Sequence, residues 1–132
     1  MQRNILVVTP TLGNRATLKR TIESVKNIGG EQVKHIIIAP LKAIAALQQE
    51  FSDIECIAEP KGCKGIYPAL NYAFNKYGHD YEYLTFINDD DYWLPAYKKL
   101  ISEITCQNLD LVYGKVKYFN YSQCIFKKMA SS

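Results

Sequence analysis

The sequence lacks any long hydrophobic run. No apolar stretch approaches the roughly 18–20 residues that a membrane-spanning helix requires, and Met1-Gln2-Arg3 leads into a predicted strand instead of a secretory signal. Internal repeats and low-complexity linkers are absent as well. At 132 residues the chain is long enough to bury a core. We therefore predict one cytoplasmic domain over residues 1–132, with a poorly defined tail at 120–132.

Zinc-binding patterns and a disulfide framework are also missing. The cysteines at positions 56, 63, 106 and 124 show no C-x-x-C spacing, and neither histidine lies close to one of them. Without a secretory signal, we expect these cysteines to be reduced thiols. We interpret His35 as a residue that flanks a strand, not as a metal ligand.

Acidic residues are absent from the last part of the chain. All 13 aspartates and glutamates lie at or before Asp110, whereas four lysines follow it. Residues 1–110 therefore carry 12 positive and 13 negative charges, a sum of −1, and the net charge of +3 comes from the tail. The slightly acidic body argues against nucleic-acid binding. The basic tail favours an anionic ligand or a peripheral contact with the inner face of a membrane.

What the sequence does contain is a regular alternation of strands and helices. Short runs of apolar, often branched residues predict strands at 5–8, 35–39, 54–58, 83–87 and 109–114. Apolar residues at helical spacing predict helices at 18–28, 43–51, 68–77 and 95–104. Residues 115–119 alternate like an edge strand. This order indicates βαβ units, so we predict an α/β fold with a Rossmann-like, mostly parallel sheet flanked by helices.

Three consecutive aspartates, Asp89, Asp90 and Asp91, directly follow the strand predicted at 83–87. Adjacent carboxylates repel one another, and a divalent cation held by oxygen ligands is their usual counter-charge. Open α/β sheets bind ligands at the carboxyl ends of their strands. We interpret the cluster as a metal site that receives a phosphate-bearing ligand. The alternative is a solvated acidic turn that caps the next helix.

Two loops are expected at the same edge of the sheet. The turn-rich segment from Thr9 to Asn14 follows the first strand. The loop before the third helix contains two Lys-Gly steps, the second at Lys64. A glycine-bearing loop that opens a helix can present backbone N–H groups to phosphate. It matches neither a Walker A loop nor a G-x-G-x-x-G fingerprint.

With these segments placed, the chain resembles the amino-terminal part of the inverting family 2 glycosyltransferases, which have the GT-A fold. Four segments carry the resemblance in the family's order: Val7–Arg15, Lys64–Asn71, Phe86–Trp93 and Asp110–Gly114. The first is similar to the family's opening strand and Pro-Thr-x-x-Asn-Arg loop. The third is similar to its version of the D-x-D motif. The resemblance extends from Ile5 to about Phe119, so we expect a truncated member of the family.

The resemblance implies a nucleotide-diphosphate sugar as donor and Mn²⁺ or Mg²⁺ as cofactor. The donor-binding residues carried over by position are Thr9, Pro10, Thr11, Arg15, Lys64, Gly65, Asn71, Asn88 and Asp89. Asp90 is the first metal ligand we predict, with Asp91 or Asp89 second. A cation held there would neutralise the negative charge that develops on the diphosphate leaving group.

Two positions depart from the family's pattern. Ala39-Pro40-Leu41 replaces the aspartates that usually follow the second strand and contact the base. Inverting members also need a general base on the acceptor side, yet no Asp, Glu or His follows Asp110. Asp91 is the only nearby candidate for that base.

Three functions are therefore open at this point. The first is a metal-dependent glycosyltransferase, or its donor-binding half, in polysaccharide or cell-envelope synthesis with an unknown acceptor. The second is a non-catalytic nucleotide-sugar-binding module, or a truncated enzyme without its general base, paired with a partner chain or a second copy. The third, a nucleotidyltransferase, is disfavoured because no Gly-rich triphosphate loop follows the first strand.

Overall fold

The computed structural model describes residues 5–107, 115–119 and 124–128. The chain divides into two compact units, residues 1–93 and residues 94–132, which we describe separately. A division into compact units does not decide whether they fold together, so the single domain over residues 1–132 stays a prediction. No helix in the described ranges combines the length and the hydropathy needed to cross a bilayer.

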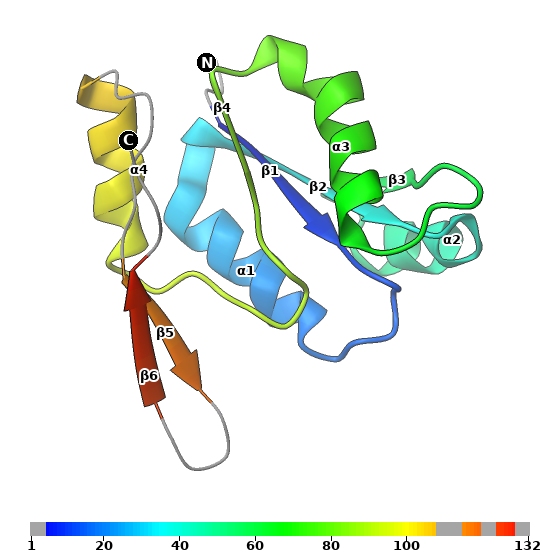
Figure 1. The fold of residues 1–132 in the computed structure, drawn as a ribbon, viewed down its shortest axis with the longest axis horizontal. Helices are drawn as coiled ribbons and strands as arrows, with labels where there is room; N and C mark the ends of the chain where they lie inside the picture. Colours follow the sequence, from blue (N-terminus) through cyan, green and yellow to red (C-terminus); the bar gives the residue numbers. More distant parts are fainter. Residues whose placement is uncertain (1–4, 108–114, 120–123, 129–132) are drawn as a thin grey trace. The chain divides into compact units, whose positions relative to one another are not determined.

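The first unit is built on a four-stranded sheet in which every pair of neighbouring strands is parallel (Figure 1). The strands are β1 (Ile5–Pro10), β2 (Val33–Ala39), β3 (Glu55–Ala58) and β4 (Tyr83–Phe86). Their order is β3-β2-β1-β4. All six residues of β1 are buried, as expected for a strand covered on both faces. The predicted α/β fold with a parallel, Rossmann-like sheet is confirmed.

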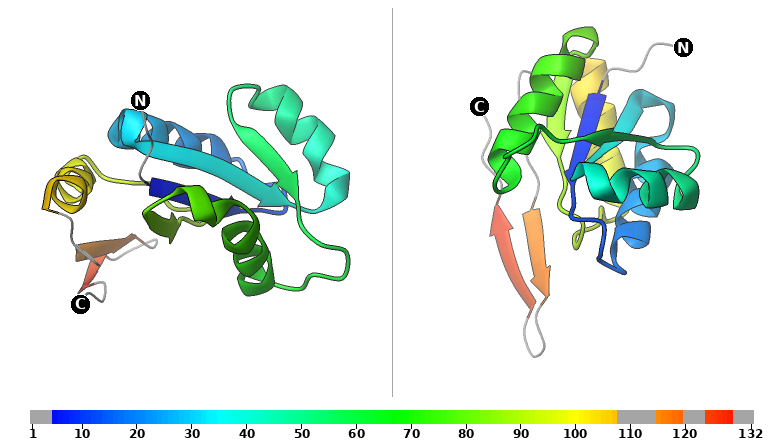
Figure 2. Two further views of the ribbon diagram at one scale, coloured as in Figure 1. Left: turned by 90° about the horizontal axis from the view of Figure 1, so that it is seen from above. Right: turned by 90° about the vertical axis from the view of Figure 1, so that its right-hand side faces the viewer.

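Helices cover both faces of this sheet. Between consecutive strands lie α1 (Leu18–Gly29), α2 (Leu41–Glu50) and α3 (Ile66–Tyr77), followed in two cases by the 3₁₀ turns η1 (Gly30–Gln32) and η2 (Gly78–Asp80). Figure 2 shows α1 and α2 on one face and α3 on the other. Each connection is thus a βαβ crossover, which brings the carboxyl ends of the four strands to one edge.

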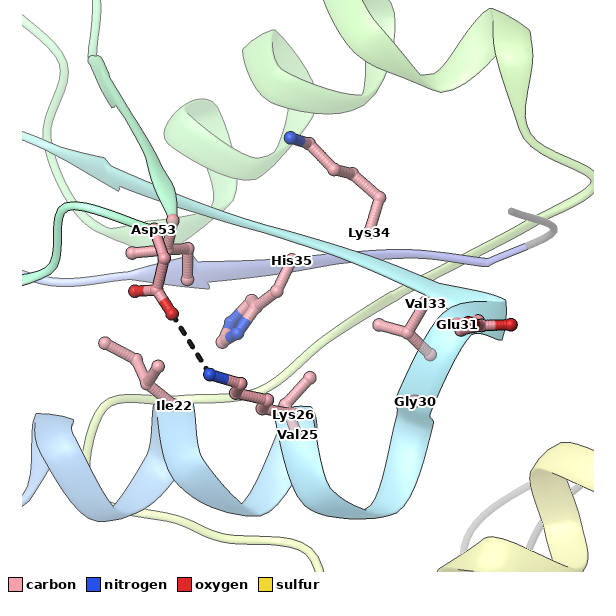
Figure 3. Close-up of a pocket in the computed structure, with 10 residues that line it drawn as sticks. Ile22, Val25, Lys26, Gly30, Glu31, Val33, Lys34, His35 and Asp53 are labelled. Carbon is pink, nitrogen blue, oxygen red and sulfur yellow. Dashed lines mark hydrogen bonds and ion pairs between the residues drawn. The ribbon is translucent and has the colours of Figure 1, made fainter. Parts of the chain in front are cut away.

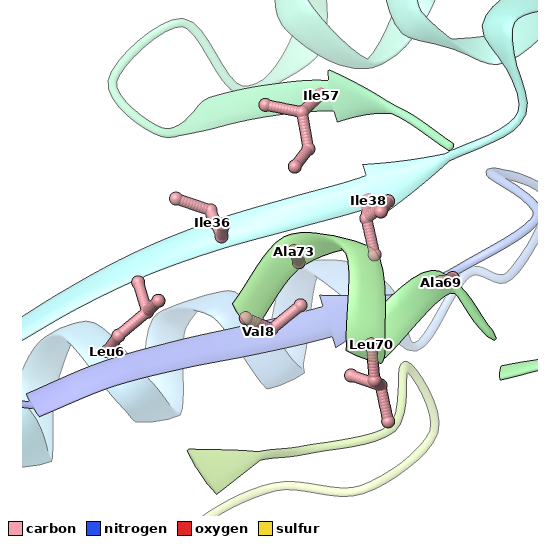
Figure 4. Close-up of a cluster of buried hydrophobic side chains, with 8 residues drawn as sticks. All are labelled: Leu6, Val8, Ile36, Ile38, Ile57, Ala69, Leu70 and Ala73. Carbon is pink, nitrogen blue, oxygen red and sulfur yellow. The ribbon is translucent and has the colours of Figure 1, made fainter. Parts of the chain in front are cut away.

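The alternation of side chains along the strands creates two separate cores. Under α3 lie Leu6, Val8, Ile36, Ile38, Ile57, Ala69, Leu70 and Ala73 (Figure 4). Under α1 and α2 lie Leu18, Ile22, Ile37, Ala39, Leu47, Phe51 and Ile54. Residues of one strand thus divide between the cores by their parity, which fixes the register against the neighbouring strands.

The edge strand β4 is less buried than the sequence suggests. The apolar run at 83–87 predicted a buried strand, but Leu84 is 47% and Phe86 is 42% exposed. The reason is position: among the described residues β4 pairs with β1 alone, so its side chains have a described strand neighbour on one side. Ile87, which follows the strand, is buried.

The described residues of the second unit form a helix and a two-stranded sheet. Its elements are α4 (Tyr97–Gln107), β5 (Lys115–Phe119) and β6 (Cys124–Lys128). The alternating residues 115–119 form a strand as predicted, and they pair antiparallel with β6. The strand at 124–128 was not predicted from the sequence. The strand predicted at 109–114 lies outside the described residues.

A cavity of about 390 Å³ lies between α1 and the amino-terminal half of β2 (Figure 3). It is lined by Ile22, Val25, Lys26, Gly30, Glu31, Val33, Lys34, His35, Asp53 and Ile54. The Lys26–Asp53 ion pair, with 3.2 Å between Nζ and Oδ2, joins two of the residues in this lining. None of the lining residues belongs to the acidic cluster, so this cavity is not the predicted metal site.

His35 belongs to β2 itself and its ring points from the strand toward α1 (Figure 3). Its Nε2 lies 2.6 Å from the hydroxyl oxygen of Thr9, whereas Nδ1 is buried and has no hydrogen-bond partner in the described part of the chain. Although part of the residue reaches solvent, burial lowers the pKa of His35 from 6.5 to about 4. The ring is therefore neutral at pH 7.

This lowered pKa predicts that His35 destabilises the protein in acid. The unfolded chain takes up a proton on His35 near pH 6.5, whereas the folded chain does so only near pH 4. The free energy of unfolding should then fall as the pH drops between these values, by up to about 3 kcal/mol from this group. Urea unfolding between pH 7 and pH 4 measures the loss, and His35→Gln should lose less. Parallel pH curves for the two proteins would contradict this account.

Candidate functional site

The acidic cluster lies beside the loop that follows β1. Because β1 and β4 are parallel neighbours, their carboxyl ends meet at the same edge. The amide of Ile87 donates to the carbonyl of Val8 at 3.1 Å, which extends the pairing past the end of β4. Beyond this point β1 and β4 continue as separate loops, and the side chains of the two loops face each other. The predicted convergence of these two segments is confirmed by the contacts that follow.

Asp89 is the anchored member of the cluster. Its residue is only 9% exposed, and its Oδ2 accepts a hydrogen bond from the Thr11 hydroxyl at 2.6 Å. The same hydroxyl oxygen accepts the amide of Gly13 at 3.0 Å, which fixes the turn. The other carboxylate oxygen, Oδ1, lies 3.3 Å from Nε of Arg15. Both oxygens of Asp89 are therefore held by the loop after β1.

Asp90 is exposed and shares the same arginine. Its Oδ2 lies 3.9 Å from Nη1 of Arg15, so one guanidinium reaches the carboxylates of Asp89 and Asp90 together. The position between these two oxygens thus already holds a positive charge. Two neighbouring carboxylates that converge on one cation are the arrangement expected of an oxygen-ligand metal site.

The carboxyl group of Asp91 has a raised pKa. Although the residue is exposed, partial burial of its carboxyl group raises the pKa, and the negative charge of Asp90 raises it further. A hydrogen bond with Asn88 acts in the opposite direction. Asp91 is therefore a stronger proton acceptor than an ordinary aspartate once it is ionised.

The main chain of the cluster is fixed by hydroxyl groups of α1 and of the residue before it. Thr17 donates to the carbonyl of Asp89 at 2.8 Å, and Thr21 donates to the carbonyl of Asp91. Ser24 accepts the amide of Trp93 at 3.0 Å and donates to the carbonyl of Thr21 at 2.8 Å. Spacings of four and three residues place these hydroxyls on one face of the helix.

Sequence reasoning missed this hydroxyl face, because only the apolar positions of the helix were read. The signal was present as small hydroxyl residues at positions 17, 21 and 24. Aromatic residues also hold the acidic loop against α1. The guanidinium of Arg20 stacks on the Tyr92 ring at 4.3 Å, and Trp93 is buried.

The remaining predicted donor-binding residues fall into two groups. Thr9 and Pro10 are buried within β1, and the hydroxyl of Thr9 faces His35 on the α1 side. Lys64, Gly65 and Asn71 are exposed, on the loop before α3 and on that helix. Gly65 has φ of +79°, a backbone conformation that suits glycine, immediately before the first residue of α3. In the described part of the chain, no hydrogen bond or ion pair joins these three residues to the acidic cluster.

The side chains that could ligate a metal limit the kind of metal site that is feasible here. Within the described ranges, no three side chains of His, Cys, Asp or Glu surround a common point. Asp89 and Asp90 do converge, on the Arg15 guanidinium. Mg²⁺ is usually held by one or two carboxylates, with water and substrate phosphates as the other ligands. The residues therefore fit an ion that is shared with a phosphate ligand and do not form a closed protein cage.

The sequence model of glycosyl transferase family 2 matches residues 6–129, almost the whole chain. This protein therefore belongs to glycosyl transferase family 2, and its parallel sheet is consistent with the Rossmann-like GT-A fold. Family membership implies binding of a nucleotide-sugar donor and an acceptor, and members commonly use divalent metals. A comparison with curated proteins found no match.

Thr21 offers the most direct test of the hydroxyl face. It is fully buried, and its hydroxyl donates to the carbonyl of Asp91, with the carbonyl of Thr17 farther away at 3.4 Å. Thr21→Val keeps the shape of the side chain but leaves that carbonyl without its donor. We expect a loss of about 1–2 kcal/mol in the free energy of unfolding in urea. A red shift of the Trp93 emission should accompany it.

Thr21→Ser is the matched control, because it restores the hydroxyl and removes only a methyl group. Its stability should lie closer to that of the wild type than to that of Thr21→Val. Equal losses in the two variants would mean that the methyl group, not the hydrogen bond to the loop, is what matters at this position.

Proposed function

We propose that this protein is a metal-dependent, inverting glycosyltransferase that transfers a sugar from a nucleotide-diphosphate sugar to an acceptor hydroxyl. The observation that carries the proposal is the convergence of the Asp89 and Asp90 carboxylates on one positive charge at the carboxyl edge of the sheet. In a family 2 domain, this edge is where a ligand is expected.

Asp90 is the residue we assign first to Mn²⁺ or Mg²⁺, with Asp89 and Asp91 as the second candidates. Asp90 is exposed, and its Oδ2 lies 3.9 Å from Arg15, beyond hydrogen-bond distance, so its carboxylate is accessible to an ion. When bound, the ion would neutralise charge on the diphosphate as the sugar leaves. Asp89, held by Thr11 and Arg15, keeps the neighbouring oxygen in place.

The protein's own cations and backbone would bind the rest of the donor. Arg15 lies at the carboxylates, and its forked guanidinium suits phosphate oxygens. Lys64 and the backbone before α3 add a positive charge and free N–H groups at a helix start. The polar residue Thr11 lies next to the Asp89 carboxylate, and Asn88 lies next to that of Asp91.

Asp91 is our candidate for the general base. Its raised pKa makes it a better acceptor for the proton of an acceptor hydroxyl, and its exposure leaves it accessible. This role requires that Asp91 is not itself bound to the ion, which the pairing of Asp89 with Asp90 allows.

A second function is favoured by one observation, the absence of any Asp, Glu or His after Asp110 in this sequence. If Asp91 is not the base, residues 1–132 act as a nucleotide-sugar-binding module, and the base comes from outside them, for example from a partner chain or a second copy. Purified protein that binds the donor in the presence of metal, but shows no turnover with any acceptor, would favour this function. A role in polysaccharide or cell-envelope synthesis, with the four carboxyl-terminal lysines at a membrane surface, is part of the proposal in either case.

Calorimetric titration of UDP-, GDP- and TDP-sugars, with Mn²⁺ and with EDTA in its place, tests the proposed donor and metal. We expect one of these donors to bind with Mn²⁺ and to bind at least about tenfold more weakly with EDTA, since the ion bridges carboxylate and diphosphate. Asp90→Asn should abolish the metal-dependent part of the binding. It should leave the fold intact, because it relieves repulsion between neighbouring carboxylates.

Asp80→Asn is the matched control, an exposed aspartate on η2 that loses the same charge away from the cluster. It should bind donor and metal as the wild type does. Metal-dependent binding that survives in Asp90→Asn would contradict the assignment of Asp90, and a wild type that binds none of the donors would contradict the proposed function.

A further inference from the structure

Arg15 occupies the position between the carboxylates at which the proposed function requires a metal ion. Its Nε lies 3.3 Å from Oδ1 of Asp89 and its Nη1 lies 3.9 Å from Oδ2 of Asp90. The guanidinium therefore contacts each carboxylate through a single nitrogen and does not form a two-bond fork with either. A divalent cation that binds these same oxygens has to replace it.

We propose that Arg15 is an exchangeable counter-ion that couples the binding of the metal to the binding of the diphosphate. Without ligands, it neutralises Asp89 and Asp90. When the ion takes the carboxylates, the guanidinium is displaced and pairs with the phosphate oxygens of the nucleoside diphosphate. This inference rests on the proposed function and adds to it an order of preference: the ion alone binds poorly, and the ion with a diphosphate binds well.

The surroundings of Arg15 make this exchange feasible. Its side chain is 58% exposed and that of Asp90 is 51% exposed, so the guanidinium can move into solvent and its pair with Asp90 contributes little free energy. The hydrogen bond from Thr11 to Oδ2 of Asp89 does not involve the arginine. Asp89 therefore keeps its orientation when the guanidinium leaves, and its Oδ1 becomes free for the ion.

A purely structural role for Arg15 predicts a different outcome. If the arginine only shields three like charges, its removal should weaken the loop, and the affinity for metal should stay the same or fall. As a displaceable counter-ion, Arg15 competes with the metal, so its removal should raise the affinity for metal alone. The removal of Arg15 should also lower the factor by which a diphosphate strengthens metal binding, because the diphosphate loses its guanidinium partner.

The experiment compares wild type, Arg15→Gln and Lys19→Gln. Lys19 is an exposed residue in the first turn of α1, so its replacement removes the same charge away from the carboxylates. Mn²⁺ is titrated alone and then with a saturating concentration of UDP, GDP or TDP. Trp93 is the only tryptophan and lies two residues after Asp91, so its fluorescence reports the approach of the paramagnetic ion.

For Arg15→Gln we expect Mn²⁺ alone to bind about two- to fivefold tighter than in the wild type, as the loss of an exposed ion pair allows. The factor by which the diphosphate strengthens Mn²⁺ binding should fall by at least about threefold. Lys19→Gln should match the wild type in both values, and all three proteins should unfold at similar urea concentrations.

Two results would overturn this inference while the proposed function stands. One is Mn²⁺ affinity that is unchanged or weaker in Arg15→Gln, and the other is an unchanged coupling to the diphosphate, each with a wild type that binds both ligands. A wild type that binds neither Mn²⁺ nor any of the nucleotides would overturn the proposed function, and this inference with it.

Discussion

The site depends on three hydroxyl groups that hold the main chain of an acidic loop against helix α1. Three neighbouring carboxylates repel one another, and a free loop would respond by turning them apart. Thr17, Thr21 and Ser24 prevent this by bonding the backbone from Asp89 to Trp93. Because these three hydroxyls bind main-chain atoms, they do not occupy the carboxylate oxygens. The main-chain hydrogen bonds thus position the loop without using the carboxylate oxygens.

The parallel sheet supplies the second condition, which is proximity. Residues 11 and 89 are 78 positions apart in sequence, yet their side chains meet because β1 and β4 are adjacent and parallel. The two cores on either side of the sheet fix the register of these strands. Asp89 then joins the two loops through Thr11 on one oxygen and Arg15 on the other. Fold, loop geometry and charge are therefore linked at this single residue.

Much of the fold could be predicted from the sequence because its strands are unusually clear. The run at 5–8 is apolar throughout and the run at 35–39 is apolar after His35, as expected of strands covered on both faces, and both are central strands here. The exposure of Leu84 and Phe86 could not be predicted, because an edge strand and a central strand share the same apolar composition. Strand order is a property of the whole sheet and is not written in any one segment.

The candidate site was predictable in its residue types but not in its contacts. The run of aspartates stood out as chemistry without a folding reason, and the resemblance to the family pointed to Thr11 and Arg15 in the loop after β1. The burial of Thr9 and its bond to His35 did not, because the face on which a strand residue lies depends on the register. The pairing of one arginine with two aspartates also needed the structure, since side-chain direction in loops has no fixed period.

The central claim is that Asp90 and its neighbours hold a cation which in turn holds the diphosphate of a sugar donor. A crystal of the protein grown with Mn²⁺ and the nucleotide sugar, measured at the manganese absorption edge, tests this claim most directly. We predict an anomalous peak at the Asp90 carboxylate, with diphosphate oxygens completing its coordination. A donor bound elsewhere, with the aspartates in contact with water alone, would contradict it.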